Sequence, residues 1–223
     1  MRSQGYYSSR TGANPAGMRL DCPALKRLFQ SIYDDFFRRD YFQEAFGYWC
    51  VDAGDVPGTL GTDIAARILV AVRKDDLWPI SERLEGYEEH DLFDMMEFLY
   101  DHVSKPVDGY FHSFSGCGMH YSTFNRKEGQ AEFRNSLNPT LAIYREGYTI
   151  SDNGEIMNLP EKGMSPLTEA NLPQHDPHNV DSRVEAAIVR FRRHHSSLED
   201  RKHALRDLAD VLEYLRPDIK NAI

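Results

Sequence analysis

The stretch DCPALKRLFQSIYDDFFRRDYF, residues 21–42, carries the strongest helical signal in the chain and decides its fold class. Its apolar residues recur at intervals of three and four, which is the spacing of one buried face of an α-helix. Asp21 is predicted to cap this helix, and Pro23 suits its first turn. The apolar face, rich in large aromatic residues, consists of Leu25, Leu28, Phe29, Ile32, Phe36 and Phe37.

The same spacing predicts three further helices in the N-terminal two thirds of the chain. One follows Thr62, its expected cap, and another lies within residues 88–106 and is ended by Pro106. The third lies within residues 130–147, where Pro139 predicts a kink and Gly147 a C-terminal cap. These segments predict a predominantly helical domain.

A short β element is predicted after the third of these helices. Two alternating runs surround Asp152-Asn153-Gly154, which is a strong hairpin signal, so we expect a small hairpin near Tyr148–Met157. Helices together with a small antiparallel element predict an α+β fold that is predominantly α-helical.

The C-terminal segment predicts two amphipathic helices that pair antiparallel. The first follows Asn179, its expected cap, and the second follows a capping box in which Ser197 stands three residues before Asp200. Residues 158–178 contain four prolines and no periodicity, as a linker does. The sequence therefore predicts an N-terminal α+β domain over 1–157, a linker over 158–178 and a helical pair over 179–223.

The composition favours a globular protein in a reducing compartment. The 223 residues include 12 Phe and 12 Tyr, and the formal net charge of −9 restricts nucleic-acid binding to a local basic patch. Three widely spaced cysteines do not suggest a disulfide framework. The N-terminus lacks a signal-peptide core, and no run is long enough to span a membrane. We therefore expect a cytoplasmic protein.

A glycine-rich stretch, residues 54–61, precedes the helix that follows Thr62, as a phosphate-binding loop would. However, Asp52, Asp55 and Asp63 lie in or beside it, and their carboxylates would repel an anion. No nucleotide-binding glycine motif is present. The sequence therefore favours a plain connecting loop here.

A second stretch contains three residues of metal-binding type, His112, Cys117 and His120. Their spacing matches no common zinc motif, and no fourth ligand is evident. The sequence therefore favours an aromatic loop or a short strand pair around Gly116 and Gly118, and it predicts no metal and no cofactor. A metal-dependent enzyme that uses these three residues with a carboxylate remains an alternative.

The stretch RFRRHHSSLEDRK, residues 190–202, contains Arg190 and His195 in the Arg-x4-His spacing of a class of metal-independent ribonucleases. Residues five apart diverge by about 140° on an intact helix, so the two side chains would meet only if the helix breaks or a dimer forms. Basic residues also favour a helix C-terminus on electrostatic grounds. The predicted contact patch for RNA or a partner consists of Arg190, Arg192, Arg193 and Arg201.

Several stretches of the sequence, taken together, resemble bacterial abortive-infection proteins of the AbiJ type, in which a sensor-like domain precedes a HEPN domain. They include YFQEAFGYWCVD, DLFDMMEFLYDHVSKP, EFRNSLNPTLAIYREGYTISDNGEI and LEDRKHALRDLADVLEYLRP, and the resemblance spans residues 7–217. It implies a helical bundle, homodimerisation and ribonuclease or toxin activity in phage defence. The family's catalytic Arg and His lie in a later helix, which has no counterpart before Ile223.

Two main functional hypotheses follow from the resemblance and the residues. In the first, which we favour, the chain is the sensor and dimerisation module of a HEPN ribonuclease or toxin system in antiviral defence. In the second, it is itself a metal-independent ribonuclease that uses Arg190 and His195. RNA or a phage-derived trigger is an expected partner, and a membrane is not.

Overall fold

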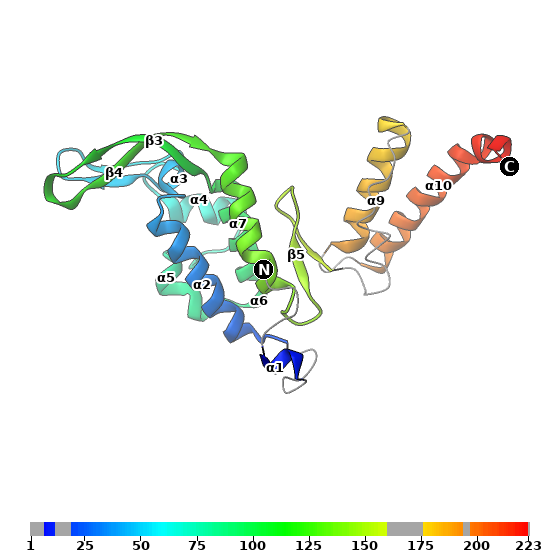
Figure 1. Ribbon diagram of the computed structural model, residues 1–223, viewed down its shortest axis with the longest axis horizontal. Helices are drawn as coiled ribbons and strands as arrows, with labels where there is room; N and C mark the ends of the chain where they lie inside the picture. The colour runs from blue at the N-terminus through cyan, green and yellow to red at the C-terminus, as the bar shows by residue number, and fades with distance from the viewer. Residues whose placement is uncertain (1–6, 12–18, 160–175, 194–196, 223) are drawn as a thin grey trace. The chain divides into compact units, whose positions relative to one another are not determined.

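The computed structural model describes residues 7–11, 19–159, 176–193 and 197–222 (Figure 1). The chain divides into two compact units, Met1–Gly154 and Glu155–Ile223. The predicted linker falls almost entirely outside the described residues, whereas the predicted fold class is confirmed. The described part is predominantly helical and contains short antiparallel hairpins.

The first unit contains helices and two of the hairpins in alternation. Its helices are α1 (Tyr7–Arg10), α2 (Cys22–Arg38), α3 (Gln43–Phe46), α4 (Ile64–Val72), α5 (Ile80–Arg83), α6 (Glu89–His102) and α7 (Arg126–Leu141). Its strands are β1 (Tyr48–Cys50), β2 (Gly54–Val56), β3 (Lys105–His112), β4 (Gly118–Asn125) and β5 (Tyr148–Ile150). Strands β1 and β2 pair antiparallel, as do β3 and β4.

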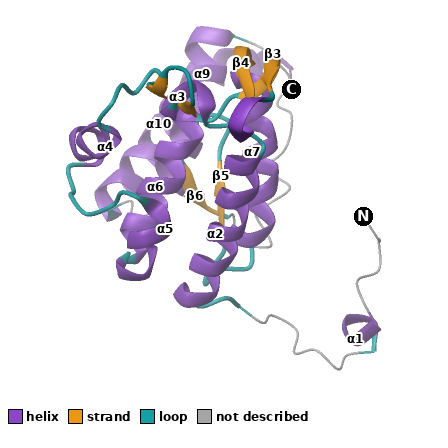
Figure 2. Cartoon of the chain, turned by 90° about the vertical axis from the view of Figure 1, so that its left-hand side faces the viewer, coloured by secondary structure: helices purple, strands orange, loops and turns teal. Residues whose placement is uncertain are grey.

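The core of the first unit lies where α7 packs against α2 and α6 (Figure 2). Phe36 of α2 meets Phe133 of α7 edge to face, with ring centroids 5.1 Å apart. Leu92 and Leu99 of α6 are fully buried. Burying side chains of this size contributes about 1.5–3 kcal/mol each, so the packing of these three helices is a main source of the unit's stability.

The structure confirms several local predictions and corrects others. Asp21 caps α2 by accepting a hydrogen bond from the backbone N–H of Ala24. The cap of α4 is Asp63 rather than the predicted Thr62, since its carboxylate accepts from the N–H of Ala66. Either residue type satisfies a free N–H at a helix start, so the sequence leaves the cap uncertain by one position.

The two later boundaries also differ from the prediction. Helix α6 ends at His102, before the predicted stop at Pro106, because Val103 turns to an extended conformation and is buried. Helix α7 retains Pro139 within it but ends at Leu141, so Gly147 is not its cap. Gly147 instead has a positive φ in the turn that leads into β5.

The second unit consists of β6 (Ile156–Asn158), a helical turn over Pro177–Asp181, α9 (Ser182–Arg192) and α10 (Leu198–Ala222). Strands β5 and β6 stand on either side of Asp152–Gly154, as the predicted hairpin requires. The predicted capping box is confirmed, since Ser197 and Asp200 exchange hydrogen bonds at the start of α10. Asp176 rather than Asn179 caps the helical turn that leads into α9, and α9 itself begins after Asp181 without a side-chain cap.

A polar network joins the end of α2 to α7 at the edge of the first unit's core. Tyr41 donates a hydrogen bond of 2.5 Å to Glu132, and Arg39 and Lys105 form ion pairs with the same carboxylate. These partners, Tyr41 first, lower the pKa of Glu132. Burial and the bond to Glu132 raise the pKa of Tyr41 to about 12.

We expect Glu132→Gln to lower the free energy of unfolding by about 1–2 kcal/mol at pH 7, because a charged acceptor shared by three donors is lost. Since the pKa of Glu132 is lowered in the folded state, its contribution is present above its ordinary pKa of about 4.3 and is lost as the pH falls further. Urea unfolding at pH 7 and at pH 3 measures this. The control Glu128→Gln, which removes a more exposed partner of Lys105, should cost less. Equal losses at both pH values would contradict the assignment.

Candidate metal centre

Two hairpins of the first unit meet at a cluster of four potential metal ligands. Cys50 ends β1, His112 ends β3, Cys117 lies in the turn between β3 and β4, and His120 lies on β4. One ligand atom from each of the four lies within 4.8 Å of every other. The structure thus supplies in Cys50 the fourth ligand that the sequence did not reveal.

The pairing of β3 with β4 explains why the two histidines face the same point. Tyr110 pairs with His120, and His112 pairs with Gly118. Side chains two apart on a strand share a face, so Tyr110, His112 and His120 lie on one face of the hairpin. Gly109 permits this close approach, since a Cβ there would lie 2.3 Å from the carbonyl oxygen of His120.

The turn of the other hairpin brings Cys50 to the same place. Strand β1 pairs Cys50 with Gly54, whose positive φ of 71° forms the tight turn. Just after Cys50, the backbone N–H of Val51 donates a hydrogen bond to the sulfur of Cys117 at 3.2 Å. A hydrogen bond of this kind stabilises negative charge on sulfur, as metal-bound thiolates require.

His112 is oriented through both of its ring nitrogens. Its Nδ1 lies 3.7 Å from the sulfur of Cys50, and its Nε2 lies 3.4 Å from a carboxylate oxygen of Asp52. Tetrahedral zinc with sulfur and nitrogen ligands separates neighbouring ligand atoms by about 3.4–3.8 Å. A carboxylate on the far nitrogen of a histidine is the usual partner of a zinc-bound imidazole.

His120 gives the strongest single indication of a ligand. Its side chain is 2% exposed, and its Nδ1 lies 3.0 Å from the hydroxyl of Tyr110. Its Nε2 is buried and has no hydrogen-bond partner among the described residues. Leaving a buried polar atom unsatisfied costs about 1–3 kcal/mol. A metal bond from Nε2 would remove that cost, while Nδ1–H donates to Tyr110.

The buried Gln43 of α3 fixes the metal-binding hairpin to the helical part of the unit. Its amide nitrogen donates to the carbonyl of Met119 at 3.0 Å, and its amide oxygen accepts from the N–H of Tyr121 at 2.6 Å. These bonds flank His120 on the same strand. The two hairpins are each only two-stranded, and such hairpins are marginally stable in water without a further cross-link.

The four side chains match a closed zinc site. Two thiolates and two neutral imidazoles balance the charge of Zn²⁺ and fill its tetrahedral positions. Four protein ligands leave no position for a water or a substrate, which is the arrangement of structural rather than catalytic zinc. Cys22, the remaining cysteine, lies at the start of α2 and does not belong to the cluster.

The predicted arginine patch is engaged within the second unit. Arg190 forms an ion pair with Asp207 of α10 at 2.5 Å, and Arg193 forms one with Glu155 at 2.9 Å. Arg192 donates to the carbonyl of Asn158, and Arg201 lies over the ring of Phe191. His195 lies outside the described residues, so the structure places only the arginine of the Arg-x4-His pair.

Comparison of the chain with models of protein families, with curated proteins and with solved structures found no match in any of the three. Among the described residues, no helix has both the length and the apolar character needed to cross a bilayer. The interpretation of the metal centre therefore depends on its own geometry.

We expect no RNA cleavage that depends on Arg190, because its guanidinium is held by Asp207. In a buffer without divalent cations, a mixed RNA substrate should show the same background level of cleavage with the parent, with Arg190→Ala and with His195→Ala. Arg190→Ala should instead lower the stability of the second unit by at most about 1 kcal/mol, as half-exposed ion pairs do. Asp207→Ala is the matched control. Cleavage by the parent that Arg190→Ala abolishes, with helicity retained, would establish the ribonuclease alternative.

Proposed function

We propose that this chain is a zinc-stabilised recognition module, in which Cys50, His112, Cys117 and His120 hold one structural Zn²⁺. The observation that carries the proposal is the convergence of these four side chains around the buried Nε2 of His120. The metal cross-links hairpin β1–β2 to hairpin β3–β4. In this proposal, the surface that recognises a partner lies on the strands of these two hairpins, and the metal fixes the position of one hairpin relative to the other.

We place this module in antiviral defence, as the sensor and dimerisation part of a HEPN ribonuclease or toxin system. The support for this setting is the resemblance of the sequence phrases to the AbiJ type. The closed coordination of the metal site favours a binding role over a metal-dependent reaction. The ion pair of Arg190 likewise favours a binding role over ribonuclease activity in this chain.

An apolar stripe on α10 supports dimerisation in this proposal. Leu198, Leu205, Leu212 and Ile219 are 46–69% exposed and recur at intervals of seven residues. Side chains seven apart lie on one line along a helix, and this stripe extends about 32 Å. That repeat is the pattern by which one helix packs against another in a coiled coil.

A second copy of the chain is the occupant that fits the stripe. In an antiparallel pair with two-fold symmetry, the same stripe on both copies forms the interface. Leu198 of one copy would meet Ile219 of the other, and Leu205 would meet Leu212. Every apolar side chain of the stripe would therefore be covered by another.

Charges beside the stripe would also be complementary in this register. Lys202 and Arg206 are exposed on one flank of the stripe, and Glu213 is exposed on the same flank further along α10. In the antiparallel pair, the two basic residues of one copy would lie near Glu213 of the other. Opposite charges that lie close together favour this antiparallel register over registers that would separate them.

The metal assignment predicts about one zinc ion per chain after purification from zinc-containing medium. Cys50→Ser, Cys117→Ser and His120→Gln should each lose most of it, whereas Cys22→Ser should retain it. Elemental analysis gives the stoichiometry, and substitution by Co²⁺ should give the visible bands of a tetrahedral thiolate site. The proposal would be refuted if the parent protein held no zinc. It would also be refuted if the Cys50→Ser variant held as much zinc as the parent.

Removal of zinc should loosen the hairpins more than the helical core. We expect a chelator to raise amide hydrogen exchange in residues 48–56 and 105–125, and to leave α2, α6 and α7 protected. Hydrogen exchange with mass spectrometry resolves these segments. Uniform loss of protection would mean that the metal supports the whole unit.

The dimer proposal predicts that Leu205→Glu combined with Leu212→Glu converts the chain to a monomer. Charged side chains in the middle of an apolar interface remain unpaired and desolvated. His203→Glu is the matched control, because this exposed position lies on the opposite side of α10. Light scattering coupled to gel filtration measures the mass. A monomeric parent, or a dimer that survives the double substitution, would disprove the stripe as the interface.

A further inference from the structure

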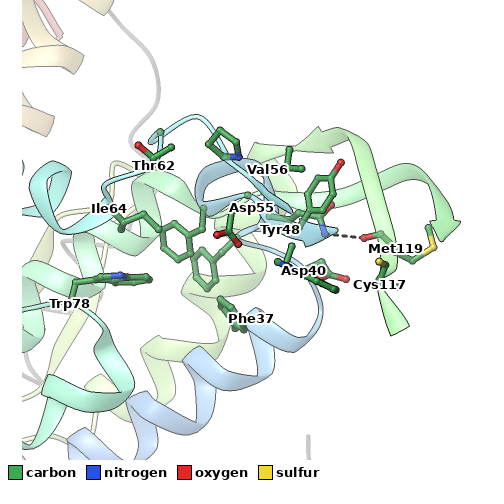
Figure 3. A pocket seen from close by; sticks show the side chains of 18 residues that line it. Phe37, Asp40, Tyr48, Asp55, Val56, Thr62, Ile64, Trp78, Cys117 and Met119 are labelled. Carbon is green, nitrogen blue, oxygen red and sulfur yellow. Dashed lines mark hydrogen bonds between the residues drawn. The ribbon is translucent and has the colours of Figure 1, made fainter. Parts of the chain in front are cut away.

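A cavity of about 700 Å³ lies beside the metal centre (Figure 3). Its wall is built from the end of α2, from α3, from hairpin β1–β2 and from the start of α4. Cys117, Gly118 and Met119 of the metal-binding hairpin complete it. Cavities of about 300–1,000 Å³ are the size that takes a small organic molecule or a protruding side chain.

Aromatic rings form much of this wall. Phe46 and Trp78 meet edge to face with centroids 5.0 Å apart, and Tyr48 lies across the cavity from Trp78 in Figure 3. Phe37 and Trp49 also line the cavity and are more than half exposed. Ring faces carry partial negative charge, so they attract a cation placed over them.

The charged groups of the cavity are all acidic. Of the 18 described residues that line it, Asp40 and Asp55 are ionisable carboxylates, and none is Lys, Arg or His. No hydrogen bond or ion pair is found for either carboxylate within the described part of the chain. Burial raises the pKa of Asp40.

The conformation of Asp40 positions its carboxylate at the wall. Its φ of 61° lies in the left-handed region, where α2 has ended and the chain turns toward α3. Gly47 allows the facing hairpin to approach, since a Cβ there would lie 1.9 Å from the carbonyl oxygen of Val56. Both of these tight backbone arrangements lie in segments that line the cavity.

We propose that this cavity binds an organic cation, an ammonium or guanidinium group carried on an apolar or planar body. Aromatic faces would contact the cation and its body, while Asp40 and Asp55 would accept its hydrogen bonds. Phosphates and carboxylates would be repelled by the same two groups. The source of the cation is either a free small molecule or a basic side chain of a partner protein.

The proposal rests on the proposed zinc centre for the rigidity of one wall. The ring of Tyr48, which lines the cavity, lies 4.2 Å from the ring of His120 between centroids. Cys117 belongs both to the cavity wall and to the ligand cluster. Occupation of the cavity and the state of the metal site are therefore expected to influence each other.

The test uses the full chain and its own tryptophans, because the sequence contains two and both line the cavity. Benzylamine, as its cation, and benzyl alcohol probe a free small molecule. Tripeptides centred on arginine or on citrulline, its neutral isostere, probe a protein side chain. We expect the cationic member of at least one pair to change the fluorescence and to bind about tenfold more tightly, a difference of about 1.4 kcal/mol.

Variants identify the carboxylates responsible. Asp40→Asn and Asp55→Asn should each weaken binding of the cation several-fold, and Asn suits the left-handed backbone at position 40. Asp101→Asn, which removes an equal charge from the exposed side of α6, should bind as the parent does. Equal binding of charged and neutral probes, unchanged binding by both cavity variants, or no binding of any probe at millimolar concentration would overturn the proposal.

Zinc content measured on the same samples separates the two proposals. Asp40→Asn and Asp55→Asn should retain zinc, because neither carboxylate belongs to the ligand cluster. Loss of cation binding with zinc retained therefore concerns the cavity alone. Parent protein that binds the cation but holds no zinc would support the cavity and refute the metal centre.

Discussion

Four potential ligand side chains converge where hairpin β1–β2 meets hairpin β3–β4. The arrangement of these two hairpins depends on that convergence. A two-stranded hairpin has few contacts beyond its own ladder, and β3–β4 exposes Val107, Tyr110 and Phe111 to solvent. Gln43 ties β4 to α3 through two hydrogen bonds, whereas the turn at Cys117 and the end of β3 contact the other hairpin through Val51 and Asp52. In the proposal, a metal bound by residues from β1, β3, the turn and β4 would strengthen that connection. Its geometry would then influence where the walls of the neighbouring cavity stand.

The helical core and the hairpins of the first unit bury different kinds of side chain. Side chains such as Phe36, Leu92 and Phe133 are buried among α2, α6 and α7 and need no ligand to be satisfied. The hairpins instead bury groups that require a specific partner, above all the Nε2 of His120. The proposal therefore assigns stability mainly to the core, and recognition to the hairpins that the metal would cross-link.

The sequence predicts the helices well because each one repeats a local signal, such as the apolar spacing and Asp21 cap of α2. It predicts the width of a buried face less well. Leu28 and Phe37 fit the apolar stripe of α2 but are 40% and 52% exposed, and Phe37 lines the cavity instead. Of the candidate metal centre, the sequence indicated His112, Cys117 and His120 but not Cys50, for a different reason. Cys50 precedes His112 by 62 positions, so no spacing rule connects them, and only the folding of two hairpins onto each other brings them together. His120 was among the residues that the sequence indicated, and it became informative only when the burial of its side chain and the unsatisfied Nε2 were known.

The same distinction between sequence and surroundings bears on the arginines of α9 and α10. As a sequence, they form a basic cluster suited to phosphates. In the folded unit, Arg190 and Arg193 each pair with a carboxylate, so binding RNA through them would first require two ion pairs to be broken. The charge that remains available to a phosphate is therefore smaller than composition suggests. The apolar stripe of α10 meets no such competition, because its side chains are exposed and burying them against any apolar surface is favourable. On these grounds, the second unit is better suited to binding another helix than to binding nucleic acid.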